Sequence, residues 1–227
     1  MIANFLCNNT TLTSLNLSGK SEDVIANNNI GSECGKEFAN TLLKNKTLKY
    51  LNLCGNELGS EGAKELADAL YKNTTLTSLE LSGNNIGLDG GIAIAQALIT
   101  NTMLNSLNLG YNNFGEDGGK ELAVALRINT TLSSLNLYGN NIGYVGGKEL
   151  AKALCENNAL KDLNLSHNFL GPEVAKEFIL ALPKNTTLIS LDLSENSLGS
   201  EELNLLDYIE NDNNTLKYFK SITVIKK

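Results

Sequence analysis

The residue types of nucleophilic catalysis occur together in one stretch of this sequence. Ser166 precedes His167, the only histidine of the chain, and Asp162 and Asp192 are the aspartates that could complete a triad. Ser166, however, is expected to face outward from a strand, and the sharp strand-to-helix turn that exposes a catalytic serine is absent. Serine also recurs periodically along the chain, so a repeat explains it. The sequence therefore predicts no catalytic residues and no enzyme.

The four cysteines could bind a metal or form disulfides. None of Cys7, Cys34, Cys54 and Cys155 belongs to a Cys-x-x-Cys pair, and His167 is close to none of them in sequence. A zinc site would therefore lack its ligands, and isolated cysteines in a long chain are not a disulfide framework. We expect no metal, no cofactor and four free thiols, which favours a reducing compartment such as the cytoplasm.

The elements that must position all these residues follow a repeat. Segments such as TLKYLNLCGN, TLTSLELSGN and TLSSLNLYGN are variants of one phrase. The phrase recurs every 28 residues after a first step of 36, with first leucines at Leu12, Leu48, Leu76, Leu104, Leu132, Leu160, Leu188 and, in a degenerate copy, Leu216. A fixed period of 20–29 residues with L-x-x-L-x-L-x-x-N is typical of leucine-rich repeats.

Each unit predicts a strand, a turn and a helix. Leu79 and Leu81 alternate with polar residues, which is the period of a strand with one buried face. The asparagine that ends each phrase is expected to bind turn backbone, with stacked copies forming a ladder. A glycine then precedes a helical pattern in which Leu66, Ala67 and Leu70 share one face. Because one unit cannot bury this face alone, the units must stack.

The pattern L-x-x-L-x-L-x-x-N-x-[IL]-G…L-A-x-A-L-x-x-N resembles ribonuclease-inhibitor-like leucine-rich repeats over roughly residues 3 to 220. Such repeats also occur in the sensor ends of NOD-like receptors and in the GTPase-activating protein of the Ran cycle. The resemblance implies a right-handed α/β solenoid, a horseshoe segment with a parallel sheet on its concave face and helices on its convex face. It also implies an intracellular setting and protein partners.

We expect one domain over residues 1–227, with about eight repeats and two departures from the period. The first is an insertion at residues 20–27, KSEDVIAN, which is either a tolerated surface loop or a functional one. The second is the degenerate copy at residues 216–227, where Ser221 takes a leucine position and Val224 the asparagine position; we expect it to cap the core. The chain starts within a unit, so either a minimal cap begins here or the chain is a piece of a longer protein.

The concave strand positions are mostly small and polar, but four residues at the ends of consecutive strands differ: Tyr111, Tyr138, His167 and Glu195. Neighbouring strands should place them within a few ångströms along one rim. Aromatic rings beside carboxylates attract an arginine or lysine of a partner, although drift on an unconstrained surface is the alternative. The predicted partner-binding set is Tyr50, Glu80, Tyr111, Tyr138, Asp162, His167, Asp192 and Glu195.

The net charge of −7 argues against nucleic acid and against an anionic membrane surface as partners. We expect a monomer that binds a protein partner on its concave face. A composition rich in Asn, Lys, Ile and Thr suggests an intracellular bacterium or a protist, and a bacterial chain of this kind would be an effector acting on a protein in the cytosol of a host cell. The alternatives are a GTPase-activating or GTPase-regulating protein of the Ran-cycle type and a sensor segment of a NOD-like receptor. Arg127, the only arginine, is expected on the helix side and offers no arginine finger.

Overall fold

A computed structural model describes residues 6–19, 30–212 and 215–220 of the chain. The strands are three residues long: β1 Ser14–Asn16, β2 Tyr50–Asn52, β3 Ser78–Glu80, β4 Ser106–Asn108, β5 Ser134–Asn136, β6 Asp162–Asn164, β7 Ser190–Asp192 and β8 Tyr218–Lys220. The helices between them are α2 Gly31–Lys44, α3 Gly59–Lys72, α4 Gly87–Thr100, α5 Gly115–Ile128, α6 Gly143–Leu154, α7 Pro172–Ala181 and α8 Ser200–Asp212. Strand and helix alternate throughout, as the repeat predicts.

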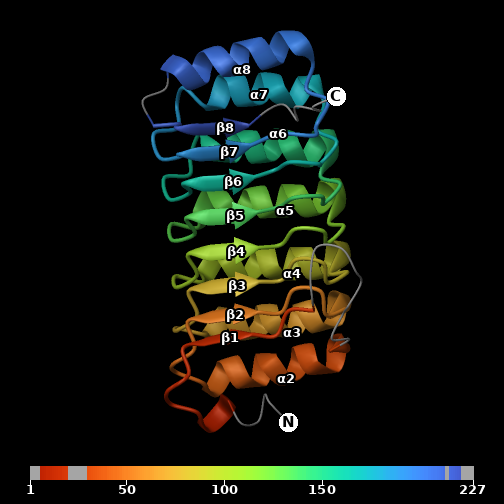
Figure 1. Ribbon diagram of the computed structural model, residues 1–227, viewed down its shortest axis with the longest axis vertical. Coiled ribbons are helices and arrows are strands. Elements are labelled where there is room, and N and C mark those ends of the chain that lie inside the picture. The colour runs from red at the N-terminus through yellow and green to blue at the C-terminus, as the bar shows by residue number, and fades with distance from the viewer. Residues whose placement is uncertain (1–5, 20–29, 213–214, 221–227) are drawn as a thin grey trace.

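The strands form one parallel sheet in chain order, from β1 to β8. Each strand pairs with its neighbour at the position one repeat away, as Leu107 pairs with Leu135 and Leu135 with Leu163. Figure 1 shows the strands as rungs along the long axis, with the helices together on the other face of the sheet. The structure therefore confirms the α/β leucine-rich repeat solenoid, with the sheet on its concave face and the helices on its convex face.

The core lies between the sheet and the helices. Strand leucines such as Leu79, Leu81 and Leu135 are at most 1% exposed, and the helix residues Leu66 and Leu70 meet them from the other side. Each helix can bury its apolar stripe only against the sheet and the neighbouring repeats. Stacking of the repeats therefore provides the hydrophobic stabilisation of the fold.

The asparagine ladder is confirmed. The side-chain amide of Asn140 donates to the carbonyls of Leu109 and Leu137 at 2.9 and 3.0 Å, and its Oδ1 accepts from the backbone N–H of Asn112 at 3.0 Å. Each rung thus binds the rung before it through buried backbone groups that the turn would leave unpaired. The ladder asparagines, all at most 2% exposed, are Asn56, Asn84, Asn112, Asn140, Asn168 and Asn196.

A second asparagine ladder, which the sequence analysis missed, runs along the other edge of the sheet. Asn129 follows the end of α5, donates to the carbonyl of Leu98 at 2.7 Å, and accepts from the backbone N–H of Leu132 at 2.8 Å. It joins the last turn of one helix to the next strand and to the preceding helix. Both edges of the solenoid are therefore tied by buried amide side chains.

Parts of two predictions lie outside the described residues. The whole insertion at residues 20–27 lies outside the described residues, and so do Ser221 and Val224 of the degenerate copy. The rest of that copy is described: Leu216 is buried, and β8 pairs in parallel with β7. Within the described residues, no helix is both long enough and apolar enough to cross a membrane.

Candidate functional site

The turns after β2 to β7 hold the chain in a left-handed conformation three residues beyond the end of the strand. Glycine occupies this position at Gly55, Gly83 and Gly139, where φ is 65° to 67°. Tyr111, His167 and Glu195 take the same position in other repeats, with φ of 53°, 59° and 58°. A side chain in this conformation costs about 1–2 kcal/mol relative to the right-handed one. Three exposed side chains therefore stand where folding alone favours glycine.

Two residues further along, the same turn has a second left-handed position. Short polar residues fill it in most repeats, as at Asn85, Asn113 and Asn141, and asparagine tolerates this conformation. Phe169 occupies it with φ of 56° and is 67% exposed. The sequence analysis missed Phe169, although one aromatic in a column of short polar residues was a detectable departure.

These side chains form a continuous aromatic rim, defined as Tyr111, Tyr138, His167 and Phe169. The rings of Tyr111 and Tyr138 meet edge to face with centroids 4.7 Å apart, and those of Tyr138 and His167 stack at 5.6 Å. His167 and Phe169 follow at 6.1 Å. The ring of Tyr111 lies against Gly139, where a Cβ would come within 2.8 Å of it. The predicted proximity of Tyr111, Tyr138 and His167 is confirmed, and the rim continues to Phe169.

The rim follows β4, β5 and β6 at their carboxyl ends, the edge marked by the arrowheads in Figure 1. A hydrogen bond with the side chain of Tyr138 raises the pKa of Tyr111 to about 12, and partial burial adds to the shift. The hydroxyl of Tyr111 therefore stays protonated at neutral pH. The rim presents the neutral hydroxyl of Tyr111 together with the faces and edges of four rings.

The predicted carboxylates differ in how freely they can bind. Glu195 and Asp162 are exposed, Glu195 in the turn after β7 and Asp162 at the start of β6. Asp192 is already engaged, because its Oδ1 accepts from the backbone N–H and the hydroxyl of Ser194 at 3.0 and 2.6 Å. The ammonium of Lys220 also lies 3.7 Å from its Oδ2. Glu195 therefore faces solvent beside the rim. Asp162 does not lie beside the rim as expected, because it is at the amino end of β6 and the rim is at the carboxyl ends of the strands.

Tyr50 and Glu80 are not part of this cluster. They are half-buried on β2 and β3, which lie three and two strands from β5. At about 4.8 Å per strand, Tyr50 is roughly 14 Å from the Tyr138 rung. Its hydroxyl accepts a hydrogen bond from Asn52 at 3.3 Å.

The asparagine column on the concave face has a structural role. Asn136 Oδ1 accepts from the backbone N–H of Tyr138 at 2.9 Å, and the same bond recurs between Asn108 and Gly110 at 3.0 Å. These side chains bind the end of their own strand. The small polar side chains of the concave face are therefore explained in part by their role in folding.

The groups that suggested catalysis are arranged for other roles. Ser166 is 3% exposed, and its hydroxyl donates to Asn164 Oδ1 at 2.6 Å. Arg127 lies on α5 with its guanidinium 3.5 Å from Glu149 on α6, on the helix side as predicted. In the described part of the chain, no three His, Cys, Asp or Glu residues are grouped so that they could hold a metal.

The cysteines are all free in the structure, and only Cys155 is exposed. Burial raises the pKa of the Cys54 thiol to about 11. Cys54 shares the strand-end column of Tyr138 but remains a neutral thiol at physiological pH.

A family model described as leucine-rich repeat matches residues 8–19, 44–67, 72–95, 100–123, 129–151 and 184–201. The chain belongs to the leucine-rich repeat family. Its 28-residue units, each with a strand and a helix, fit the ribonuclease-inhibitor-like type. Leucine-rich repeats indicate a protein-interaction module, and their fold is typically a non-catalytic binding scaffold.

Solved leucine-rich repeat structures resemble the chain. Actin-binding site 2 of leiomodin-1 is 25% identical, with a TM-score of 0.53 over 66% of this chain and 86% of that one. The tropomodulin C-terminal domain of Caenorhabditis elegans is 11% identical, with a TM-score of 0.53 over 68% and 92%. The leucine-rich repeat protein LegL7 of Legionella pneumophila is 27% identical, with a TM-score of 0.45 over 88% and 72%. A comparison with curated proteins gave no significant match.

Proposed function

We propose that the chain binds a protein partner across its concave sheet, with the aromatic rim as the anchor. The observation that carries this proposal is the left-handed backbone at Tyr111, His167 and Phe169. Side chains that are unfavourable for folding and exposed to solvent have no stabilising role to explain them, and such strain concentrates at functional sites.

The rim has the composition of an interface anchor. Tyrosine buries a large rigid surface and keeps a polar tip, and it is enriched among residues that dominate binding energy. The eight strands at ~4.8 Å give a concave face of about 35 Å, enough for a standard interface of ~800 Å² per partner. A few aromatic anchors surrounded by small polar residues can therefore support specific binding.

The chemistry of the rim favours a basic partner segment. Rings bind guanidinium and ammonium groups through their faces, and the exposed carboxylate of Glu195, in the turn next to that of His167, can form a charge-assisted hydrogen bond with the same partner group. The net charge of −7 would also speed the approach of a basic partner. We therefore propose that the partner presents arginine or lysine to the rim.

The setting of this function is also part of the proposal. Four free cysteines suit a reducing cytoplasm, either that of the cell that makes the chain or, for an effector, that of a host cell. Leiomodin-1, similar in fold, has an actin-binding site in its matching domain. Actin is therefore the first candidate partner to measure.

The test replaces rim residues with the residues that the same columns hold in other repeats. The rim-reverted variant carries Tyr111→Gly, Tyr138→Ser and Phe169→Asn, and Tyr144→Ala on α6 removes a tyrosine that is exposed outside the rim. Titration with actin, followed by capture from cell lysate, compares these two variants with the unmodified chain. We expect proteins that bind the unmodified chain and the Tyr144→Ala variant but not the rim-reverted one. If every bound protein is retained equally by the rim-reverted variant, the rim is not the anchor.

A further inference from the structure

The convex face departs from its own repeat at α4 and, in the last repeat, at α8, which carries Asn204 and Leu205 at the equivalent positions. Helices α2, α3, α5, α6 and α7 carry a Lys-Glu pair at the same two positions, residues 36–37, 64–65, 120–121, 148–149 and 176–177. Helix α4 carries Ile92 and Ala93 there instead. After Asp89, the rest of α4 has no charged residue.

In α6 and α7, the glutamate of this pair reaches the preceding helix and forms an ion pair with it. Glu177 Oε1 on α7 lies 3.1 Å from the ammonium of Lys148 on α6. Glu149 Oε2 on α6 likewise lies 3.5 Å from the guanidinium of Arg127 on α5. Ala93 has no side chain that could reach back to α3 in this way.

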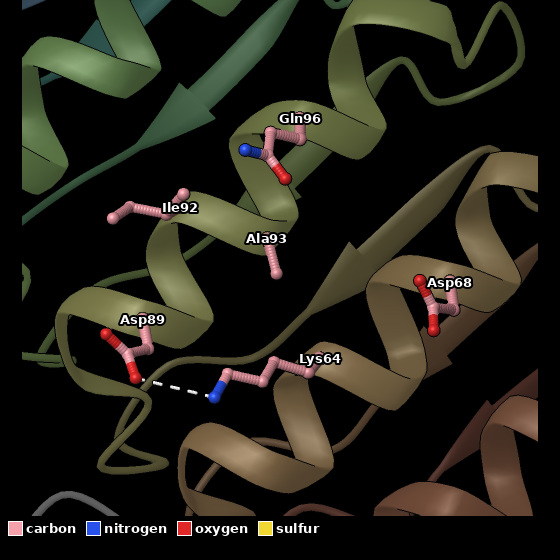
Figure 2. Close-up of a pocket in the computed structure, with 6 residues that line it drawn as sticks. All are labelled: Lys64, Asp68, Asp89, Ile92, Ala93 and Gln96. Carbon is pink, nitrogen blue, oxygen red and sulfur yellow. Dashed lines mark hydrogen bonds and ion pairs between the residues drawn. The ribbon is translucent and has the colours of Figure 1, made fainter.

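A shallow, open groove of about 400 Å³ lies between α3 and α4, where Ala93 stands in place of the glutamate. Figure 2 shows Ala93 between the two helices, with Lys64 and Asp68 on one side and Ile92 and Gln96 on the other. The hollow continues toward the end of α3, where Ala67, Tyr71 and Ala97 line it. Three alanines, Ala67, Ala93 and Ala97, therefore line the hollow together with polar residues of both helices.

The two ends of the groove differ in charge. At one end, the ammonium of Lys64 lies 3.4 Å from Asp89 and 3.0 Å from Glu61, so its charge is satisfied. At the other end, Asp68 forms no ion pair with any described residue. Asp68 shares this end with Tyr71, which is 61% exposed. A carboxylate beside an exposed ring is a favourable place for a cation.

Exposed apolar side chains also occur on α4 and α5, on the side of α4 away from the groove. Leu88 on α4 and Val124 and Ile128 on α5 are 39%, 37% and 52% exposed. Ion pairs link α3 to α4 and α5 to α6, but none links α4 to α5 among the residues described. Exposed apolar residues also occur on other helices, such as Leu180 on α7, so the distinctive feature of α4 is the missing Lys-Glu pair.

We infer that the groove between α3 and α4 binds a helix of a second protein, one that presents short apolar side chains and a lysine or arginine. An amphipathic helix lies along a groove of this kind with its apolar residues at i, i+3, i+4 and i+7. Its apolar residues contact Ile92, Ala93 and Ala97, and its basic residue lies against Asp68 and the ring of Tyr71. The groove is on the opposite face from the rim, so the two sites can be occupied together.

The charge of the chain favours this occupant over a second copy. Another copy brings its own net charge of −7 to a groove whose open end is acidic. A basic helix meets the opposite charge at the same place. Self-association through α4 is therefore the outcome that we do not expect.

The test uses a displayed library of 16-residue helical peptides, selected on the full chain. The Ala93→Glu variant restores the residue of five sister helices, so it should fold normally while filling the groove and pairing with Lys64. We expect enriched peptides to carry a lysine or arginine beside apolar residues and to bind Ala93→Glu about tenfold more weakly or worse. They should bind the rim variant Tyr138→Ser as tightly as the unmodified chain.

Three results would overturn the proposal: no enriched peptide, enriched peptides without a basic residue, or equal binding to Ala93→Glu. Asp68→Asn gives a second reading, because it should weaken basic peptides several-fold while leaving the apolar contacts intact. Sedimentation of the chain alone completes the test. A dimer that disappears on Ala93→Glu would assign the groove to self-association and exclude a foreign helix.

Discussion

The aromatic rim and the convex groove are both departures from one repeat, but they are made in opposite ways. The rim adds side chains where sister repeats hold glycine, serine or asparagine. The groove lies where side chains are missing, because α4 lacks the Lys-Glu pair that five other helices carry. In a solenoid the repeat defines what folding requires, so function is most readable where one copy differs from the others.

The two departures should differ in their cost to folding. Tyr111, His167 and Phe169 hold left-handed backbone, which is unfavourable for bulky residues. Replacing an exposed Lys-Glu pair by Ile92 and Ala93 costs little, since surface ion pairs contribute about 0–1 kcal/mol. The rim therefore has a measurable effect on stability, whereas the groove has almost none.

The largest expected effect tests the hydrophobic core that supports both the rim and the groove. Leu135→Ala should lower the free energy of unfolding by ~2–5 kcal/mol, because Leu135 is 1% exposed and a cavity replaces it. Chemical denaturation followed by circular dichroism measures this change. An unchanged denaturation midpoint would show that Leu135 does not contribute to the core. The rim and the groove could then not be treated as two surfaces of one shared core.

The next effect separates the two surfaces by binding. The rim-reverted variant should lose about 2 kcal/mol or more of affinity for a rim-bound partner, as loss of interface hot spots does. Ala93→Glu should leave that affinity unchanged and weaken only a groove-bound peptide. Calorimetric titration of each variant with each ligand gives all four values. If either variant weakens both ligands equally, the two surfaces are not independent.

Much of this frame could be predicted from the sequence. The 28-residue step gave the strand positions, the buried leucines and the asparagine ladder, because each of these has one side-chain requirement per repeat. Tyr111, Tyr138 and His167 were identifiable because they interrupt columns of small residues. The periodic positions thus predict the fold, and the residues that interrupt the period predict the candidate site.

The missed features have physical reasons. Phe169 lies in the turn beyond the strand, so a search limited to the strand positions and strand ends passed over it, although it interrupts a column of mostly short polar residues. Ala93 was overlooked because alanine is an ordinary helix residue, and a groove is visible only when the neighbouring helix is placed beside it. Asp192 was counted as a binding residue, but its bonds to Ser194 were not readable from spacing.

A smaller effect tests the backbone strain at Glu195, which holds the same left-handed turn position as Tyr111 and His167 of the rim. Glu195→Gly should raise the free energy of unfolding by about 1 kcal/mol, because glycine accepts the φ of 58° without steric conflict. Glu195→Ala is the matched control, since it removes the carboxylate but keeps a Cβ in the strained conformation. Thermal unfolding of both variants decides the point. A gain with alanine as large as with glycine would attribute the effect to charge, and the turn at Glu195 would carry no backbone strain.

The smallest effect concerns the contact between the two tyrosines of the rim. Tyr138→Phe keeps the ring that stacks on His167 but removes the hydroxyl that raises the pKa of Tyr111 to about 12. The pKa of Tyr111 should then fall toward the usual value of about 10. Because the folded-state pKa is raised, the stabilisation from this contact is present below about pH 10 and is lost as the pH rises toward 12. Tyr111 is 55% exposed, so stability at pH 7 should change by only a few tenths of a kcal/mol. Carbon-13 NMR of the tyrosine Cζ resonances measures the titration, with the exposed Tyr144 as an internal reference. A Tyr111 pKa that does not move would mean that the rings meet only through their faces and edges, and the rim would then present two separate hydroxyls to its partner.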